Sequence, residues 1–288
     1  MSRIGVMFDR DLSPEDLPAF AAAVEEAGAD DLWVVEDLGW AGSISSVALA
    51  LAATSRIRIG IGITPAPLRS PALLAMELAV LARVHPGRVV AGLGHGVAEW
   101  MRQVGVEPKS KLAMLEETLL AVRGLLQGEM VTLDGREVRI DGVRLVHPPA
   151  VVPPIVTGVV RPRSLELSGR VADGTIIAEG NGPEQLGDAL THIRRGGATD
   201  AHELIVFTFL HVNDDPKDAA EVTGTTVAGQ ADWLGVPPEE VFSLIGPVAE
   251  VPGKVAALTA AGARTIVLRP LGPDPVPQVK AALSALGR

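Results

Sequence analysis

Short apolar runs alternate with longer amphipathic stretches along the whole chain, which is the pattern of repeated strand–helix units. The pattern is clearest over residues 56–96, where a β-branched run at 56–63 precedes an apolar stretch and a second apolar run at 88–93. Ser70 and Pro71 supply an N-cap and a first-turn proline for the helix between the two runs. A unit of this length predicts two parallel strands joined by a right-handed crossover.

The same alternation continues to the end of the chain and predicts eight strand–helix pairs. Eight pairs with no sign of a second domain predict a single-domain α/β protein, a (β/α)8 TIM-like barrel spanning residues 1–288. An open doubly wound sheet is the alternative. The strands are expected at 3–8, 32–36, 56–63, 88–93, 154–158, 175–178, 203–212 and 264–269, and the helices at 13–28, 43–53, 70–87, 109–126, 162–168, 183–195, 252–261 and 276–286.

Two segments do not fit the repeat. Residues 131–145 contain two Asp-Gly turns and predict a small β excursion outside the barrel. Residues 214–251 hold helical pieces and prolines and predict a helical insertion.

Composition narrows the possible classes of protein. Lys and Arg number 25 against 35 Asp and Glu, and this acidic balance disfavours a nucleic-acid partner. The chain has no cysteine and no tyrosine, which excludes disulfides, thiolate metal sites and phenolic catalysis. The six histidines show no metal-ligand spacing, so no metal site is expected. Charged residues interrupt the N-terminal apolar run and no apolar run spans a bilayer, so we expect a cytoplasmic protein without a membrane partner, acting on a small-molecule substrate.

Parallel α/β proteins bind ligands at the carboxyl ends of their strands, and several glycine-flanked polar residues fall there. Gly60 and Gly62 end the third strand, either to let a flat ligand approach or to pack the barrel. A dinucleotide fingerprint is excluded because Pro65 stands where its third glycine belongs. His95 lies between two glycines after the fourth strand, where it either contacts a ligand or binds a neighbouring carbonyl.

Acidic residues follow two other strands. Glu36 and Asp37 end the second strand, and strand alternation predicts that only one of them faces the barrel mouth. Glu179 ends the sixth strand and is either a site carboxylate or a loop residue. Among the tryptophans, those at 40 and 100 fall near rim loops and could wall a pocket, whereas Trp33 is expected in the core.

The loop between the fifth strand and its helix contains the groups that an anion site needs. Residues 157–164 combine a glycine turn, a helix start, hydroxyl groups and the two arginines Arg161 and Arg163. In a chain this acidic, that cluster favours a phosphate site over an ordinary loop with solvated arginines.

Three segments together resemble the bacterial luciferase-like monooxygenase family, in particular its deazaflavin-dependent oxidoreductase branch. They are AVEEAGADDLWVVEDLGW, LAATSRIRIGIGITPAPLRSPALLAMELAVLARVHPGRVVAGLGHGVAEWMRQVG and ELSGRVADGTIIAEG. The resemblance implies a barrel that binds coenzyme F420 or FMN at its carboxyl rim. It also implies a bulge at Gly62-Ile63, often with a non-proline cis bond, behind the cofactor ring. Many members carry Asp-His where this chain has Glu36-Asp37, so Asp37 is expected to take the place of that imidazole.

From the resemblance, together with the residues at the strand ends, we predict an oxidoreductase that transfers hydride between F420 and a small organic substrate. The alternatives are an FMN-dependent monooxygenase and a non-catalytic cofactor-binding barrel. A homodimer through the alanine-rich faces at 47–53 and 72–81 is expected by analogy with related barrels. The expected catalytic residues are Asp37 and His95, and the expected cofactor-binding residues are Glu36, Gly62, Ile63, Thr64, Gly94, Gly96, Val97, Thr157, Gly158, Val159, Arg161, Arg163 and Glu179.

Overall fold

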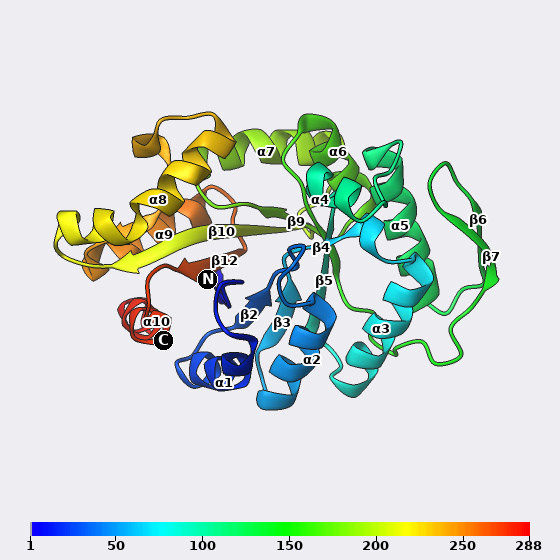
Figure 1. Ribbon diagram of the computed structural model, residues 1–288, viewed down its shortest axis with the longest axis horizontal. Coiled ribbons are helices and arrows are strands. Elements are labelled where there is room, and N and C mark those ends of the chain that lie inside the picture. The colour runs from blue at the N-terminus through cyan, green and yellow to red at the C-terminus, as the bar shows by residue number, and fades with distance from the viewer. Residues whose placement is uncertain (1) are drawn as a thin grey trace.

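The computed structural model describes residues 2–288 and contains a closed ring of parallel strands with helices around its outside (Figure 1). The strands follow one another in the order β10, β12, β1, β2, β3, β5, β8 and β9, and β9 pairs with β10 to close the ring. The predicted barrel is therefore confirmed, and the open sheet is excluded. The ring strands are β1 (Arg3–Met7), β2 (Asp31–Val34), β3 (Arg58–Ile61), β5 (Val89–Gly94), β8 (Ile155–Gly158), β9 (Gly174–Ile177), β10 (Glu203–Val212) and β12 (Thr265–Pro270).

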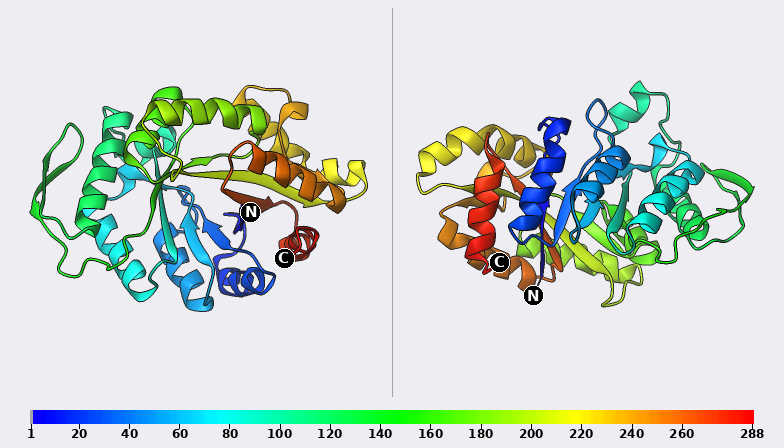
Figure 2. Two further views of the ribbon diagram at one scale, coloured as in Figure 1. Left: turned by 180° about the vertical axis from the view of Figure 1, so that it is seen from behind. Right: turned by 90° about the horizontal axis from the view of Figure 1, so that it is seen from below.

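One helix follows each strand and covers the outer face of the ring (Figure 2). Local start signals act as expected, since the Ser70 hydroxyl accepts a hydrogen bond of 3.3 Å from the Leu73 amide at the start of α3. The predicted bounds of α2, α7 and β10 agree with the structure to the residue. The outer helices are α1 (Leu17–Glu26), α2 (Ser43–Ala53), α3 (Pro71–Val84), α5 (Lys111–Leu126), α6 (Pro162–Val171), α7 (Pro183–Arg195), α9 (Val251–Ala260) and α10 (Pro275–Ala285).

Both predicted excursions are present. The first is the antiparallel hairpin of β6 (Val131–Asp134) and β7 (Arg139–Val143), which projects beside α5 in Figure 1. The second contains α8 (Pro216–Leu234). It is less purely helical than predicted, because it also contains β11 (Leu244–Gly246), which pairs with β10. The sequence pattern missed two short elements, β4 (Thr64–Pro65) and α4 (Ala98–Gln103).

The inside of the barrel is packed around a tryptophan. Trp33 is fully buried, as predicted, and its ring meets the Phe207 ring edge-on with the centroids 5.6 Å apart. A Cβ atom at Gly60 would lie only 2.4 Å from the Trp33 ring. Gly60 therefore serves barrel packing, which was one of the two interpretations of this position.

Charged side chains close the amino end of the barrel. Asp31 is fully buried and accepts hydrogen bonds from Arg3 at 2.6 Å and from Arg58 at 2.7 Å. Arg58 also donates to Glu203 at 3.0 Å, and the Thr265 hydroxyl donates to the same carboxylate at 2.5 Å. Burial alone would lower the pKa of Arg58, but Asp31 and Glu203 outweigh burial and raise it.

In residues 2–288, no helix is both long enough and apolar enough to cross a membrane.

Candidate active site

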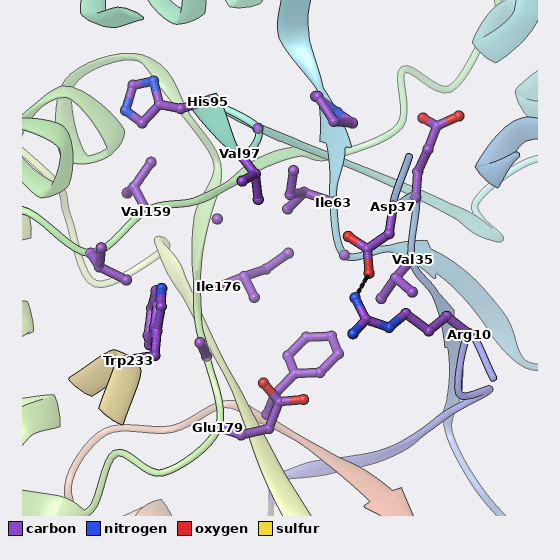
Figure 3. Close-up of a pocket in the computed structure, with 18 of the residues that line it drawn as sticks. Arg10, Val35, Asp37, Ile63, His95, Val97, Val159, Ile176, Glu179 and Trp233 are labelled. Carbon is purple, nitrogen blue, oxygen red and sulfur yellow. Dashed lines mark hydrogen bonds and ion pairs between the residues drawn. The ribbon is translucent and has the colours of Figure 1, made fainter. Parts of the chain in front are cut away.

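A cavity of about 680 Å³ lies at the carboxyl ends of the ring strands (Figure 3). Residues of all eight ring strands or of the loops after them line it, and α8 adds Gln230 and Trp233. The regions around residues 62, 95 and 158, which the sequence placed at one rim, face this one cavity. The lining residues are Met7, Arg10, Val35, Glu36, Asp37, Gly62, Ile63, Pro65, His95, Gly96, Val97, Trp100, Gly158, Val159, Val160, Arg161, Ser164, Ile176, Ala178, Glu179, Phe207, Gln230, Trp233 and Arg269.

The floor of the cavity is apolar and is built around Ile63. The peptide bond between Gly62 and Ile63 is cis, as the resemblance implied. The Ile63 side chain packs against two neighbouring strands at glycines, since a Cβ at Gly94 or Gly158 would come within 2.8 Å or 2.6 Å of it. Gly94 is buried beneath Ile63 and does not line the cavity. These glycines therefore make room for the Ile63 side chain at the floor.

Glu36 is fixed in place by several donors. Arg69 donates two hydrogen bonds of 2.6 Å to it, the Ser43 hydroxyl donates one of 3.0 Å, and the Thr64 hydroxyl donates another. Burial alone would raise the pKa of Glu36, but these hydrogen bonds outweigh burial and lower it. Thr64 thus holds Glu36 from behind and is not itself a lining residue.

Both Glu36 and Asp37 line the cavity, which corrects the expectation that only one would. The reason is that β2 ends at Val34, so the strand alternation on which the expectation rested stops before either acid. Asp37 forms an ion pair with Arg10, which comes from the loop after β1 (Figure 3). The Arg10 guanidinium lies 4.6 Å from the centre of the Trp40 ring, so Trp40 supports Arg10 from outside the cavity.

Arg269 and Glu179 form a second ion pair in the cavity. Arg269 donates from Nε to Asp9 at 2.7 Å and from Nη1 to Glu179 at 3.1 Å. Burial alone would lower the pKa of Arg269, but the two carboxylates raise it. Gln230 on α8 donates to the Glu179 carbonyl at 2.6 Å, which ties the insertion to the cavity wall. Glu179 is thus placed in the cavity rather than in a remote loop.

His95 lies across the cavity from the Arg10–Asp37 pair (Figure 3). Its Nδ1 donates to the Lys111 carbonyl at 3.2 Å, because a carbonyl oxygen can only accept. Burial lowers the pKa of His95 and favours the neutral ring, whose Nε2 then accepts from the Ser164 hydroxyl at 2.9 Å. Both ring nitrogens are therefore engaged by protein groups, and His95 fixes the orientation of Ser164.

The N-terminus of α6 opens beside this histidine. No side chain caps the helix, and Arg161 at the cap position lines the cavity together with Ser164 and Gly158. The structure places two other expected phosphate residues away from the cavity. The Thr157 hydroxyl donates to Ser168 at 2.6 Å, because this strand position faces α6, and Arg163 is exposed on the outer side of the helix start.

Several lining residues were not found from the sequence. Arg10 follows β1 and Arg269 lies near the carboxyl end of β12, so the rim rule could have drawn attention to both, but neither has a glycine or a helix start beside it. Gln230 and Trp233 come from the insertion, and no sequence signal connects that segment to the barrel mouth. Trp100 does line the cavity, as anticipated for a rim tryptophan.

The features of the cavity fit a flat ring with a phosphate tail. The apolar floor at Ile63 offers a surface on which a planar group can pack, and the uncapped N-terminus of α6 with Arg161 suits an anion. Within residues 2–288, no group of three or more acidic, histidine or cysteine side chains could hold a metal ion.

A family model and several curated proteins match this chain. The sequence model described as luciferase-like monooxygenase matches residues 1–265. A 5,10-methylenetetrahydromethanopterin reductase from Methanolobus tindarius is 28% identical over 245 residues, which cover 80% of this chain and 74% of that protein. An F420-dependent glucose-6-phosphate dehydrogenase from Nakamurella multipartita is 30% identical over 205 residues, covering 65% of this chain and 59% of that protein.

Solved structures share the fold over nearly the whole chain. The F420-dependent tetrahydromethanopterin reductase from Methanopyrus kandleri has a TM-score of 0.87 at 20% identity and covers 99% of this chain and 98% of its own. An F420-dependent secondary alcohol dehydrogenase bound to an F420-acetone adduct also has a TM-score of 0.87, at 21% identity, with 99% of both chains covered. The oxygenating constituent of 3,6-diketocamphane monooxygenase from Pseudomonas putida, in complex with FMN, has a TM-score of 0.76 at 18% identity and covers 98% of this chain and 96% of its own.

Proposed function

The chain belongs to the luciferase-like monooxygenase family, and from that premise we propose that it is an oxidoreductase that uses coenzyme F420 to transfer hydride to or from a small organic substrate. One observation carries the proposal. A single cavity joins the apolar floor at Gly62–Ile63 to the uncapped N-terminus of α6. A planar ring with a phosphate tail needs both features side by side. The F420-dependent relatives support this choice of cofactor.

Each end of the cofactor has candidate partners in the chain. Ile63 would support the ring from below, and Val97 and Val159 would flank it. Gly158, the start of α6, Arg161 and Ser164 would bind the phosphate. When bound, the deazaflavin supplies the ring carbon that gives or takes hydride. The protein's part is to position the ring and keep water off its apolar face.

Asp37 is our candidate for the group that handles a proton near the substrate. It lines the cavity, and the ion pair with Arg10 orients it. His95 is engaged on both nitrogens, so we assign it a positioning role through Ser164. This sharpens the earlier expectation that either residue could move the proton.

Cofactor titration tests the proposal. Purified protein titrated with F420 and with FMN, followed by calorimetry, should bind F420. Arg161→Ala should weaken F420 binding about tenfold to a hundredfold, because a charge-assisted hydrogen bond contributes about 1.5–3 kcal/mol. Arg163→Ala should weaken it less, since Arg163 lies outside the cavity. Arg170→Ala is the matched control, because Arg170 is on the same helix and pairs with Glu116 on the surface.

FMN is the alternative cofactor, because its ring and phosphate need the same floor and helix start and one structural relative holds it. Tight FMN binding with no F420 binding would overturn the proposal in favour of a monooxygenase. F420 binding without reduction of any enone, imine or lactol by reduced F420 would favour a carrier instead. Loss of such activity in Asp37→Ala, with cofactor binding intact, would argue against the carrier.

We also propose that the protein is a homodimer. Four apolar side chains, Leu73, Met76, Val80 and Val84, follow one face of α3 and are 47–66% exposed, and Leu49 of α2 is 49% exposed. An apolar stripe of this length is typical of a protein–protein interface. Light scattering should give twice the chain mass, and Val80→Asp should shift it to the mass of one chain. A wild-type mass of one chain would contradict the dimer.

A further inference from the structure

Building on the proposed function, we infer that the end of the cavity opposite α6 binds the substrate and selects an uncharged molecule with hydroxyl or carbonyl groups over an anion such as a sugar phosphate. The ring order places this end. Arg10 follows β1, which lies directly across the barrel from β8, the strand that leads into α6. Arg269 lies near the carboxyl end of β12 and Asp37 follows β2, and these are the strands on either side of β1. A phosphate tail held at α6 leaves this opposite end for the second reactant.

Two ion pairs at this end offer hydrogen-bonding groups of both kinds. Arg10 uses Nη1 for Asp37, and Arg269 uses Nε for Asp9 and Nη1 for Glu179. Within residues 2–288, Nη2 of both arginines and one oxygen each of Asp37 and Glu179 have no hydrogen-bond partner. Among the same residues, Nε of Arg10 also has no partner, so each pair keeps at least one donor group and one acceptor oxygen. A hydroxyl group can donate to the carboxylate and accept from the guanidinium at the same time.

The charges at this end disfavour an anionic ligand. The two arginines are matched by Asp37 and Glu179, and Asp9 adds a third carboxylate beside Arg269. A phosphate would have to approach these carboxylates or displace them from their arginines, and either course costs free energy. The α6 end differs, because Arg161 there has no carboxylate partner among residues 2–288 and is available to an anion. The cavity thus separates an anion-binding end from an end suited to an uncharged polar molecule.

Apolar residues near the two ion pairs would contact the hydrocarbon part of the substrate. Val35, Met7 and Phe207 are apolar residues that line the same cavity. They suit the hydrocarbon part of an alcohol or ketone whose oxygen reaches Arg10 and Asp37.

Three cyclohexanols that differ only in the 4-substituent test the inference. The trans-4-hydroxyl compound is uncharged, the trans-4-carboxylate is an anion and the trans-4-ammonium compound is a cation. Calorimetry on protein saturated with F420 should show the hydroxyl compound binding at least about tenfold more tightly than the carboxylate, because like charges brought together cost several kcal/mol. The carboxylate should bind least tightly of the three, since the carboxylates at this end outnumber the arginines. F420 binding is measured first, so its failure would count against the proposed function and not against this selectivity.

Two variants examine the cause of the selectivity. Asp37→Asn leaves Arg10 without its countercharge, and Glu179→Gln leaves Arg269 with Asp9 alone. Each should shift the preference toward the carboxylate by about tenfold. Glu116→Gln is the matched control, because it makes the same change in net charge at the surface pair with Arg170. Melting temperature and F420 affinity confirm that the variants are folded. Equal or tighter binding of the carboxylate by the wild type, binding of none of the three, or no shift in both variants would overturn the inference.

Discussion

The two ends of the barrel use the same residue types in different ways. At the amino end, Asp31 is fully buried and both of its oxygens accept from arginines. At the carboxyl end, the side chains of Arg10 and Asp37 are 33% and 23% exposed, and each keeps atoms without a partner among residues 2–288. A charged cluster whose polar atoms all have protein partners holds strands together. A cluster that keeps polar atoms without a protein partner can bind a ligand with them. The two roles make opposite predictions for stability and binding.

The largest expected effect is on stability at the amino end. Asp31→Asn leaves Arg3 and Arg58 short of a buried countercharge, so the free energy of unfolding should fall by about 3–5 kcal/mol. Asp37→Asn breaks a partly exposed pair and should change it by about 0–1 kcal/mol. Urea unfolding measures both. Equal losses in the two variants would show that the ends do not differ as described.

Glycines give a second, smaller contrast between the barrel interior and the cavity floor. Gly60→Ala pushes a Cβ against the buried Trp33 ring, which has no room to move, and should destabilise the fold by about 1–3 kcal/mol. Gly158→Ala meets Ile63, which is only half-buried and can rise into the cavity. It should cost less stability and weaken F420 binding more.

Gly187→Ala is the control for both glycine variants, because Gly187 is an exposed residue of α7 with nothing within 4 Å of an added Cβ. It should leave the protein as stable or slightly more stable. A large loss of stability in Gly158→Ala with unchanged cofactor affinity would contradict the assignment of Ile63 to a ligand-facing floor.

The sequence predicts the fold and part of the cavity, but not the ion pairs that form across the closed ring. Periodicity and helix start signals predict the barrel, and the rule that sites lie at the carboxyl ends of the strands correctly places Gly62, His95 and Gly158 at one cavity. It failed for Thr157 because the strand parity there turns the hydroxyl toward α6. The same rule did not identify Arg10 and Arg269, because their role depends on which carboxylates the closed ring brings beside them. Pairing across the ring is a tertiary property that no local pattern encodes.

A last, smallest contrast compares one histidine at each end. His95 at the carboxyl end and His202, just before β10 at the amino end, both have a pKa below the ordinary value of 6.5, mainly because burial disfavours the charged ring. A folded-state pKa below the unfolded one contributes stability that is present above pH 6.5 and is lost as the pH falls below it. His95→Asn and His202→Asn should therefore each make the free energy of unfolding fall less steeply between about pH 7.5 and pH 5.5.

Bound cofactor separates the two histidines. Saturating F420 raises the melting temperature of a protein that binds it only when folded. His202→Asn should keep that increase, because His202 contacts Thr175 outside the cavity. His95→Asn should reduce it, because Ser164 loses the acceptor that orients its hydroxyl at the start of α6. An unchanged increase in His95→Asn would mean that the hydroxyl of Ser164 does not contact the ligand, and the anion-binding end would then rest on Arg161 and the helix start alone.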